Sequence, residues 1–390
     1  MAKVSMKARK EVLDKHTSKY RNASKKEKGK ILDVVCGSTG LSRDRAARLL
    51  TARPKSRSTM KPQKTGKRGR NRIYDLPVIR GLKEIWVYMD FACGKRLHEG
   101  IGDMLDALIR FNAVSYDAEV VRKLRQMSAA TMDRLLKRDR EALRLKGIST
   151  TKPGTLLKRN IPLRLGQDWD DAIPGFVEID LVAHCGPTAA GEYVNTLNIT
   201  DICTGWTEPV AVINKAQRHV FAGLMDVELR QPFPFSGIDS DNGSEFINNE
   251  LYRFCKEKGI CFTRSRPYTK NDSCHVEQKN WSLVRRHIGY DRFEGEAAVT
   301  LLNAYYALLR LHVNFFLPST KLIEKNRDRA HVYKRYEKPL TPFRRVLAHP
   351  HIPDTVKKDL NSFFLTINPS KLVHDMIEIK AELDMLSIQS

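Results

Sequence analysis

The sequence predicts a multidomain protein in which helical regions flank a central α/β domain. The chain has 390 residues, which is more than one ordinary domain holds. Apolar residues recur at helical spacing through most of residues 1–146 and again near the C-terminus. Between these regions, residues 173–317 predict three meandering strands followed by alternating helices and strands. That order is typical of a mixed sheet with helices around it.

The charge of the chain indicates a polyanionic partner. The formal net charge is +23 and the sequence pI is near 9.7, which favours nucleic acid or an acidic membrane surface. Residues 1–75 hold 23 Lys and Arg against 6 Asp and Glu, so most of the excess precedes the central domain. A partner of opposite charge is therefore expected first at the N-terminal region.

Cysteine usage and hydropathy predict a soluble protein in a reducing compartment. The 7 cysteines are scattered without a CxxC or a paired Cys/His spacing, which argues against a disulfide framework and against a structural zinc site. No apolar run approaches the roughly 18 residues of a membrane span, and the N-terminus lacks the apolar segment of a signal peptide. We expect a cytoplasmic location.

Residues 1–53 predict a helix-turn-helix DNA-binding domain. Ser24 and Glu27 have the spacing of a capping box at the start of one helix. After a turn containing glycine, a second helix over 42–50 turns Arg43, Arg45 and Arg48 outward. Helix, turn and basic second helix is a DNA-reading arrangement. The alternative is an ordinary helical hairpin with solvated arginines.

Residues 54–74 predict a basic linker. Residues 54–72 contain eight basic residues, no acid, two prolines and two glycines, a composition that cannot form a core of its own. The segment is either a solubilising hinge or an arm that follows phosphates or enters a minor groove, and these two roles are compatible. The basic residues proposed for DNA contact here are Lys67, Arg68, Arg70 and Arg72.

Residues 75–146 predict a second helical, helix-turn-helix DNA-binding domain, followed by a connecting strap over 147–172. Ser128 is the expected N-cap of the last helix, whose apolar face contains Met132 and Leu136. Two such domains joined by a basic arm would read a long DNA site in two pieces. A helical bundle that serves only assembly is the alternative.

Three acids lie on three separate elements of the central domain. Asp180 is in the predicted strand 176–184, Asp241 ends the strand 235–241, and Glu277 is in the predicted helix 275–287. The spacings are 60 residues between the first two acids and 35 between the second and third. Carboxylates without a nearby Cys/His cluster suit a hard cation such as Mg²⁺. Two such ions can stabilise both oxygens of an in-line phosphoryl displacement.

This stretch resembles the catalytic core of retroviral-type integrases and of bacterial insertion-sequence transposases, the D,D-35-E group. The resemblance covers roughly Ile173 to Leu317 and includes the acid spacing, DSDNGSEF around Asp241 and SRPYTKNDSCHVEQKN through Glu277. It implies a ribonuclease-H-like fold and a DNA transposase that cleaves element ends and joins them to target DNA. It further implies Asp180, Asp241 and Glu277 as catalytic ligands of two Mg²⁺ or Mn²⁺ ions. The implied partners are transposon-end and target DNA and further copies of the chain in a homo-oligomer on DNA, and the implied location is the bacterial cytoplasm at the nucleoid. The need for an accessory protein stays open.

The residues around the three acids are alternative ligands or residues with auxiliary, DNA-contacting or structural roles. Glu178 and Asp239 are rival ligands because each shares a strand face with a proposed acid. Asn242, His275 and Asn280 are expected auxiliary residues; Lys279, Arg285 and Arg286 are expected DNA contacts; Trp281 is expected to anchor its helix; and His184 is expected to be structural.

Two other functions remain open beside the transposase. One is a catalytically silent DNA-binding regulator, and the other is a structure-selective nuclease on the same fold. Residues 318–390 predict a basic C-terminal region with helices. The last helix has apolar residues that suit packing on the body or on a second copy, and the resemblance favours the second copy.

Overall fold

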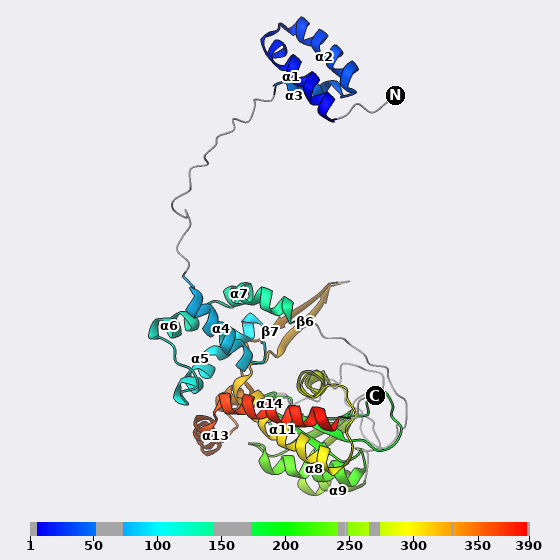
Figure 1. Ribbon diagram of the computed structural model, residues 1–390. Helices are drawn as coiled ribbons and strands as arrows, with labels where there is room; N and C mark the ends of the chain where they lie inside the picture. Colours follow the sequence, from blue (N-terminus) through cyan, green and yellow to red (C-terminus); the bar gives the residue numbers. More distant parts are fainter. Residues whose placement is uncertain are drawn as a thin grey trace. The chain divides into compact units, whose positions relative to one another are not determined.

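The computed structural model describes residues 6–51, 73–143, 173–240, 246, 249–264, 274–328 and 331–387. The chain forms two compact units, residues 1–71 and 72–390 (Figure 1). The predicted linker lies almost wholly outside the described residues, and so does the strap over 147–172. We describe each unit by itself.

The first unit is a three-helix cluster. It consists of α1 (Met6–Asn22), α2 (Lys25–Thr39) and α3 (Arg43–Thr51). Tyr20, Leu32, Val35, Ala46 and Leu50 form its small buried core. The predicted capping box is present, because Ser24 and Glu27 exchange hydrogen bonds between side chain and backbone at the start of α2. Gly40 ends that helix in the left-handed conformation, with φ of 69°.

The centre of the second unit is a five-stranded mixed sheet. The strand order is β3-β2-β1-β4-β5, from β1 (Phe176–Ala183), β2 (Asn195–Asp201), β3 (Thr207–Val212), β4 (Gly237–Ser240) and β5 (Cys261–Arg264). β1, β2 and β3 pair antiparallel, and β4 and β5 continue the sheet in parallel with β1. The predicted mixed sheet, with three meandering strands first, is confirmed.

Alternation along β1 gives the two faces of the sheet different chemistry. Val177 and Ile179 belong to an apolar cluster that α8 (Gln217–Arg230) and α9 (Asn249–Lys258) complete. Glu178 and Asp180 project from the opposite face, because successive side chains of a strand alternate. This second face meets α10 (Cys274–Lys279), which packs against β1 and β2. The carboxylates thus lie on the face that a short helix covers.

The helices of residues 73–143 share a hydrophobic core with the central domain and the C-terminal region. They are α4 (Leu76–Tyr88), α5 (Gly94–Arg110), α6 (Ala118–Gln126) and α7 (Ala129–Ala142). One buried cluster joins residues such as Trp86 and Leu105 to Tyr306 and Phe316 of α11 (Gly295–Phe316). Ser128 caps α7 as predicted, accepting a hydrogen bond from the backbone of Thr131. These helices are therefore part of one compact unit with the sheet.

The C-terminal region contains helices, as predicted, and also a β-hairpin that the sequence analysis did not predict. β6 (Leu322–Asp328) and β7 (His331–Tyr336) form a separate two-stranded sheet. α12 (Pro342–Ala348), α13 (Asp354–Thr366) and α14 (Pro369–Leu386) follow. α14 packs along α11 and buries Leu372, Met376 and Leu383, so its apolar face covers the body of this chain. Among the described residues, none of the helices combines the length and the apolar character that crossing a membrane requires.

Candidate active site

Asp180 is held by polar contacts on the middle strand of the sheet. Its Oδ2 accepts a hydrogen bond of 2.6 Å from the Nδ2 of Asn280, and its Oδ1 accepts one of 2.8 Å from the backbone N–H of Leu181. Asn198 lies directly opposite Asp180 in the antiparallel register. The Nδ2 of Asn198 donates to the Oδ1 of Asn280 over 2.9 Å. A chain of two amides therefore fixes this half-buried carboxylate.

The helix that carries Glu277 is attached to β1 at two points. The backbone N–H of Val276 donates to the Oε2 of Glu178 over 2.9 Å. One turn later Asn280 contacts Asp180. Glu277 lies between these attachments and three residues before Asn280, a spacing that places the two on one side of a helix. The side chains of Glu277 and His275 themselves lie outside the part that the structure describes.

The second proposed acid follows the described end of β4. The last pair in the parallel register is Ile179 with Ser240, and in the sequence these two residues are followed by Asp180 and Asp241. Asp241 and Asn242 lie outside the described residues. Within the described part of the chain, no group of three or more His, Cys, Asp or Glu side chains forms a candidate metal cluster.

The two rival carboxylates have structural contacts. Glu178 is fully buried and holds the start of α10 through Val276. Asp239 is 1% exposed and accepts a hydrogen bond of 2.5 Å from the hydroxyl of Thr263 on the neighbouring strand β5. Both acids lie deeper in the protein than Asp180, which is half-buried. Asn198 was not singled out by the sequence analysis, because its contact with Asn280 joins residues that are far apart in the sequence.

A π-helical segment continues directly from α10. It runs from Asn280 to Arg285 and is labelled η1 here. Such segments are rare and often occur at functional sites. Trp281 is 44% exposed, so the expectation that its side chain anchors the helix is wrong; Leu283 and Val284 supply the buried contacts of η1 instead. The wider π turn brings these two apolar residues to the core while Asn280 remains at Asp180.

The three basic residues proposed near Glu277 have different surroundings. Lys279 lines a cavity of about 130 Å³ together with Arg96 and Lys321. Burial, together with the nearby charges of Arg96 and Arg345, lowers the pKa of Lys279 to about 7. The positive charge of Lys279 is thus disfavoured by burial and by the nearby guanidinium groups of Arg96 and Arg345.

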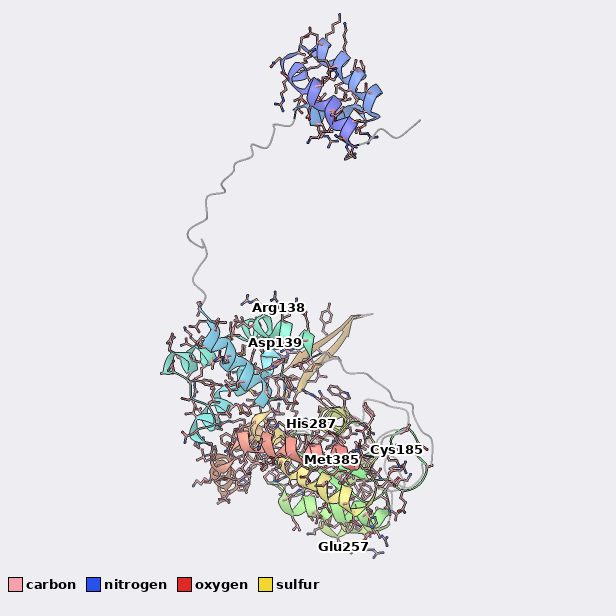
Figure 2. All side chains as sticks on the ribbon, viewed as in Figure 1. Arg138, Asp139, Cys185, Glu257, His287 and Met385 are labelled. Carbon is pink, nitrogen blue, oxygen red and sulfur yellow. The ribbon has the colours of Figure 1, made fainter. Side chains whose placement is uncertain are left out.

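The side chains of Arg285 and Arg286 donate hydrogen bonds to other parts of the protein. Arg285 donates to the carbonyl of Ala183 over 2.9 Å. Arg286 forms an ion pair of 2.9 Å with Asp90 and donates to the backbone carbonyl of the same residue over 2.7 Å. His287, labelled in Figure 2, follows on the same segment and lies 3.7 Å from the other oxygen of Asp90. These contacts attach the loop after α4 to the helix of the candidate site.

The basic residues proposed on the first unit lie on α3. Arg45 is exposed, Arg43 forms an ion pair with Asp33, and Arg48 donates to the backbone carbonyl of Asp44 over 3.4 Å. Lys67, Arg68, Arg70 and Arg72 lie outside the described residues.

His184 lies in the interior of the protein, four residues after Asp180 in the sequence. It is fully buried, and its Nε2 lies 2.7 Å from the hydroxyl of Thr196, which in turn contacts the hydroxyl of Tyr306 over 2.6 Å. Burial lowers the pKa of His184 to about 3, so the ring is neutral at neutral pH. This arrangement agrees with the structural role expected for His184.

Comparisons with known proteins identify the class of the central domain. A family model described as integrase core domain matches residues 171–270. Among solved structures, the catalytic core of BIV integrase is 16% identical, covers 36% of this chain and 83% of that one, and gives a TM-score of 0.27. The HTLV-2 integrase catalytic core in complex with magnesium is 12% identical, covers 38% and 92% of the two chains, and gives a TM-score of 0.30. The family match, together with the strand order of the sheet, indicates an integrase-type core in the central domain.

A full-length relative defines the family of the whole chain. The Uncharacterized protein y4rM of Sinorhizobium fredii (strain NBRC 101917 / NGR234) is 38% identical over 343 residues, which cover 88% of this chain and 96% of that protein. The chain therefore belongs to the same family as y4rM.

Proposed function

We propose that the protein is a DNA transposase. It binds the inverted-repeat ends of a mobile element, cleaves to expose 3′-hydroxyl groups and joins these to target DNA. The observation that carries the proposal is the double attachment of α10 to β1, through Glu178 with Val276 and through Asp180 with Asn280. It holds the helix of Glu277 against the strand of Asp180, and that strand lies within residues 171–270, which match the integrase core domain.

The proposed metal ligands are Asp180, Asp241 and Glu277. The described surroundings fit a hard cation, because Asp180 and its neighbours Asn198 and Asn280 offer oxygen and amide groups and no thiolate. Two Mg²⁺ or Mn²⁺ ions, when bound, would supply charge stabilisation for the attacking and leaving oxygens. Glu178 accepts a hydrogen bond from Val276, and Asp239 accepts one from Thr263. These structural contacts support the choice of Asp180 and Asp241, rather than their neighbours, as metal ligands.

The reaction consists of two phosphoryl transfers at one site. In the first, a water oxygen bonds to phosphorus at the element end, the bond from phosphorus to the 3′ oxygen breaks, and a 3′-hydroxyl is released. In the second, that hydroxyl bonds to a target phosphorus, and the target's own 3′ oxygen leaves and takes up a proton. One phosphodiester replaces another, so no nucleotide cofactor is required. The protein contributes positioning and charge stabilisation. Asn280 holds Asp180 in one orientation.

DNA binding is assigned to the basic N-terminal region. The helices α2 and α3 form the first proposed reading unit, with Arg43, Arg45 and Arg48 on α3, and the arm containing Lys67, Arg68, Arg70 and Arg72 follows the phosphates. Residues 75–146 form the second proposed reading unit, and Lys279, Arg285 and Arg286 are the remaining proposed contacts. The excess of 23 basic over 6 acidic residues in 1–75 supports this assignment. We further propose a homo-oligomer that bridges two element ends.

The test is a joining assay with labelled DNA that carries the element's own ends, found as inverted repeats flanking the gene. The protein is incubated with this DNA, a target plasmid and Mg²⁺ or Mn²⁺. Wild type is expected to give joined product, and Asp180→Asn and Glu277→Gln are expected to give none. Glu257→Gln is the matched control, because Glu257 is an exposed glutamate on α9 and its loss leaves joining intact (Figure 2).

The outcomes separate the proposal from the two other functions. Cut DNA without joined product would indicate the structure-selective nuclease. Salt-sensitive binding without cleavage under either metal would indicate the silent regulator. Joined product that persists in Glu277→Gln would contradict the proposed third acid.

A further inference from the structure

The hairpin of β6 and β7 presents side chains on both of its faces to solvent. Leu322 is 45%, Ile323 56%, Tyr333 63% and Tyr336 51% exposed. The two strands form a sheet of their own, apart from the five-stranded sheet (Figure 1). An isolated two-stranded hairpin is marginally stable in water. The exposure of four large side chains on such an element indicates a surface that a partner covers.

The register of the hairpin separates its charges onto one face. Cross-strand pairs place Leu322 with Tyr336, Lys325 with Lys334 and Arg327 with Val332 on a first face, which we call the basic face. The other pairs are Glu324 with Arg335, Asn326 with Tyr333 and Asp328 with His331, and they form the second face. Alternation along each strand gives this division, and a register shift between Leu322 and Glu324 brings Leu322 opposite Tyr336. The basic face has three cationic residues and no acid, whereas the second face has two acids and one arginine.

The register places unlike charges opposite one another on the second face and like charges opposite one another on the basic face. Arg335 forms an ion pair of 3.2 Å with Glu324 on the second face. On the basic face, Lys325 and Lys334 are direct partners in the ladder. Like charges directly opposite one another destabilise a sheet. An anion bound across this pair would remove the repulsion, so the basic face is complementary to a polyanion.

Duplex DNA fits this surface in shape as well as in charge. The major groove of B-DNA admits a two-stranded β-ribbon. Lysine, arginine and tyrosine side chains are common donors to phosphate oxygens. Lys334 and Tyr336 are exposed on the basic face, and the register assigns positions 325 and 327 of the neighbouring strand to the same face.

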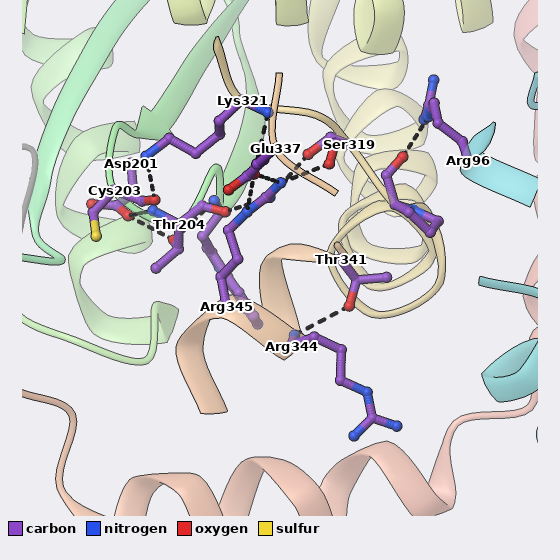
Figure 3. Close-up of polar contacts among 12 residues, drawn as sticks. Arg96, Asp201, Cys203, Thr204, Ser319, Lys321, Glu337, Thr341, Arg344 and Arg345 are labelled. Atoms are coloured by element: carbon purple, nitrogen blue, oxygen red, sulfur yellow. Dashed lines mark hydrogen bonds and ion pairs between the residues drawn. The ribbon is translucent and has the colours of Figure 1, made fainter. Parts of the chain in front are cut away.

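The base of the hairpin is fixed to the catalytic core. Arg345 is 8% exposed and donates to the carbonyl of Thr204 over 3.0 Å, to the carbonyl of Ser319 over 2.6 Å and to Glu337 over 2.9 Å (Figure 3). Lys321 donates to the carbonyl of Cys203 over 2.7 Å, as Figure 3 also shows. Thr204 and Cys203 belong to the turn between β2 and β3. A DNA segment on the hairpin would therefore be held in a set orientation to the sheet that carries Asp180.

We propose that the basic face of the β6–β7 hairpin binds the phosphate backbone of duplex DNA. The inference deepens the proposed function, on which it rests, by adding a DNA-contacting ribbon in the C-terminal region. The contact is to phosphates, so it positions the duplex and is independent of base sequence.

The test compares two neighbouring residues on opposite faces of the hairpin. Lys334→Gln and Arg335→Gln each remove one positive charge from an exposed position of β7. Binding of the full-length chain to a duplex of random sequence is measured by fluorescence anisotropy over a series of salt concentrations. A lysine that contacts phosphate contributes about one unit to the slope of log K against log salt. Lys334→Gln is expected to reduce the slope by about one, and Arg335→Gln to leave it unchanged.

A second measurement keeps the test independent of charge and folding. The photo-crosslinking amino acid p-benzoylphenylalanine replaces Tyr336, on the basic face, or Tyr333, on the second face. Both tyrosines are exposed on the same strand, so the pair is matched. Crosslinks to DNA are expected from position 336 and not from position 333.

The proposal is overturned when Lys334→Gln and Arg335→Gln change the salt slope equally or not at all, or when crosslinks form equally from the two positions. If the wild-type protein joins DNA ends but the two variants change the salt slope equally, or the two positions crosslink equally, the hairpin inference fails and the transposase proposal stands. If wild type neither binds nor joins DNA, the transposase proposal fails, and the hairpin inference fails with it.

Discussion

Asn280 is the residue that connects the two described parts of the candidate site. It donates to Asp180 and accepts from Asn198, so it lies between the strand and the helix of the proposed acids. Partners that orient a metal ligand cost about 10- to 100-fold in metal affinity or activity when removed. Asn280→Ala is therefore expected to reduce joining about 10- to 100-fold and to raise the Mg²⁺ concentration needed for half-maximal rate. Both quantities come from one metal titration of the joining rate.

Asn303 provides the matched control for this prediction. Its side chain also makes two hydrogen bonds, accepting from the backbone N–H of Ala211 over 2.8 Å and donating to the carbonyl of the same residue over 3.0 Å. Asn303→Ala leaves buried backbone groups without partners and is expected to cost about 1–3 kcal/mol of stability. It should leave the Mg²⁺ dependence unchanged. Equal shifts of that dependence in the two variants would show that Asn280 acts through stability alone.

His184 gives the protein a pH-dependent stability with a definite sign. Burial, with a smaller contribution from the charge of Arg285, lowers its pKa from 6.5 to about 3. The unfolded chain therefore binds a proton between pH 6.5 and 3 that the folded chain does not. Stability contributed by the neutral ring is complete above pH 6.5 and is lost as the pH falls, at up to about 1.4 kcal/mol per pH unit.

The variant His184→Gln isolates this contribution, because glutamine keeps a polar group near Thr196 and does not titrate. Urea unfolding of wild type and variant is measured at several pH values from about 7.5 to 5. The stability difference, wild type minus variant, is expected to fall by about 1 kcal/mol per pH unit below pH 6. A difference that stays constant with pH would mean that the ring is accessible to protons in the folded protein.

At the scale of elements, the pairing of β1 with β4 sets the distance between the strands of the first two proposed acids. Gly237 faces Phe176 across this pair, and a Cβ at position 237 would lie 2.3 Å from the ring. Gly237→Ala must therefore move the ring or separate the strands. Overpacking of this kind typically costs about 1–3 kcal/mol. We expect a loss of stability of that size, measured by urea unfolding, together with slower joining.

Gly102→Ala is the control for this substitution. Gly102 is inside α5, and the nearest atom to a new Cβ is the end of the Arg125 side chain at 3.9 Å. Alanine there is expected to raise stability by roughly 0.5–1 kcal/mol, because glycine is a poor helix residue. A Gly237→Ala protein as stable and as active as Gly102→Ala would mean that the β1–β4 spacing tolerates the clash.

The sequence predicted most elements of the central domain because their patterns are local. Val177 and Ile179 alternate with Glu178 and Asp180, and this period of two identifies a strand with one apolar and one polar face. The π-helical segment from Asn280 to Arg285 was not predicted, because its extra residue per turn is fixed by contacts of Leu283 and Val284 with the core. The hairpin was missed because its strands are mostly polar in sequence and have no apolar periodicity.

At the scale of the whole molecule, sequence patterns did not predict the long-range contacts. The amide chain from Asn198 to Asp180 joins residues of β1, β2 and η1, and no local spacing identifies such a triple contact. The predicted domains 75–146 and 318–390 have helices as expected. Their apolar faces, however, meet those of the central domain in one cluster that includes Trp86, Tyr306 and Phe364. Only the folded chain shows which helical faces cover one another.

This shared cluster limits which segments of the chain recombination can exchange during evolution. A piece that ends between residues 143 and 173 would divide one hydrophobic core, since Leu105 and Phe316 lie on either side of the cut. The same holds for a cut after α11, because α14 covers that helix. The first unit has its own core of Tyr20, Leu32, Val35, Ala46 and Leu50. Recombination that replaces residues 1–71 would change the first unit alone. The described core of residues 72–390 would be inherited as one piece.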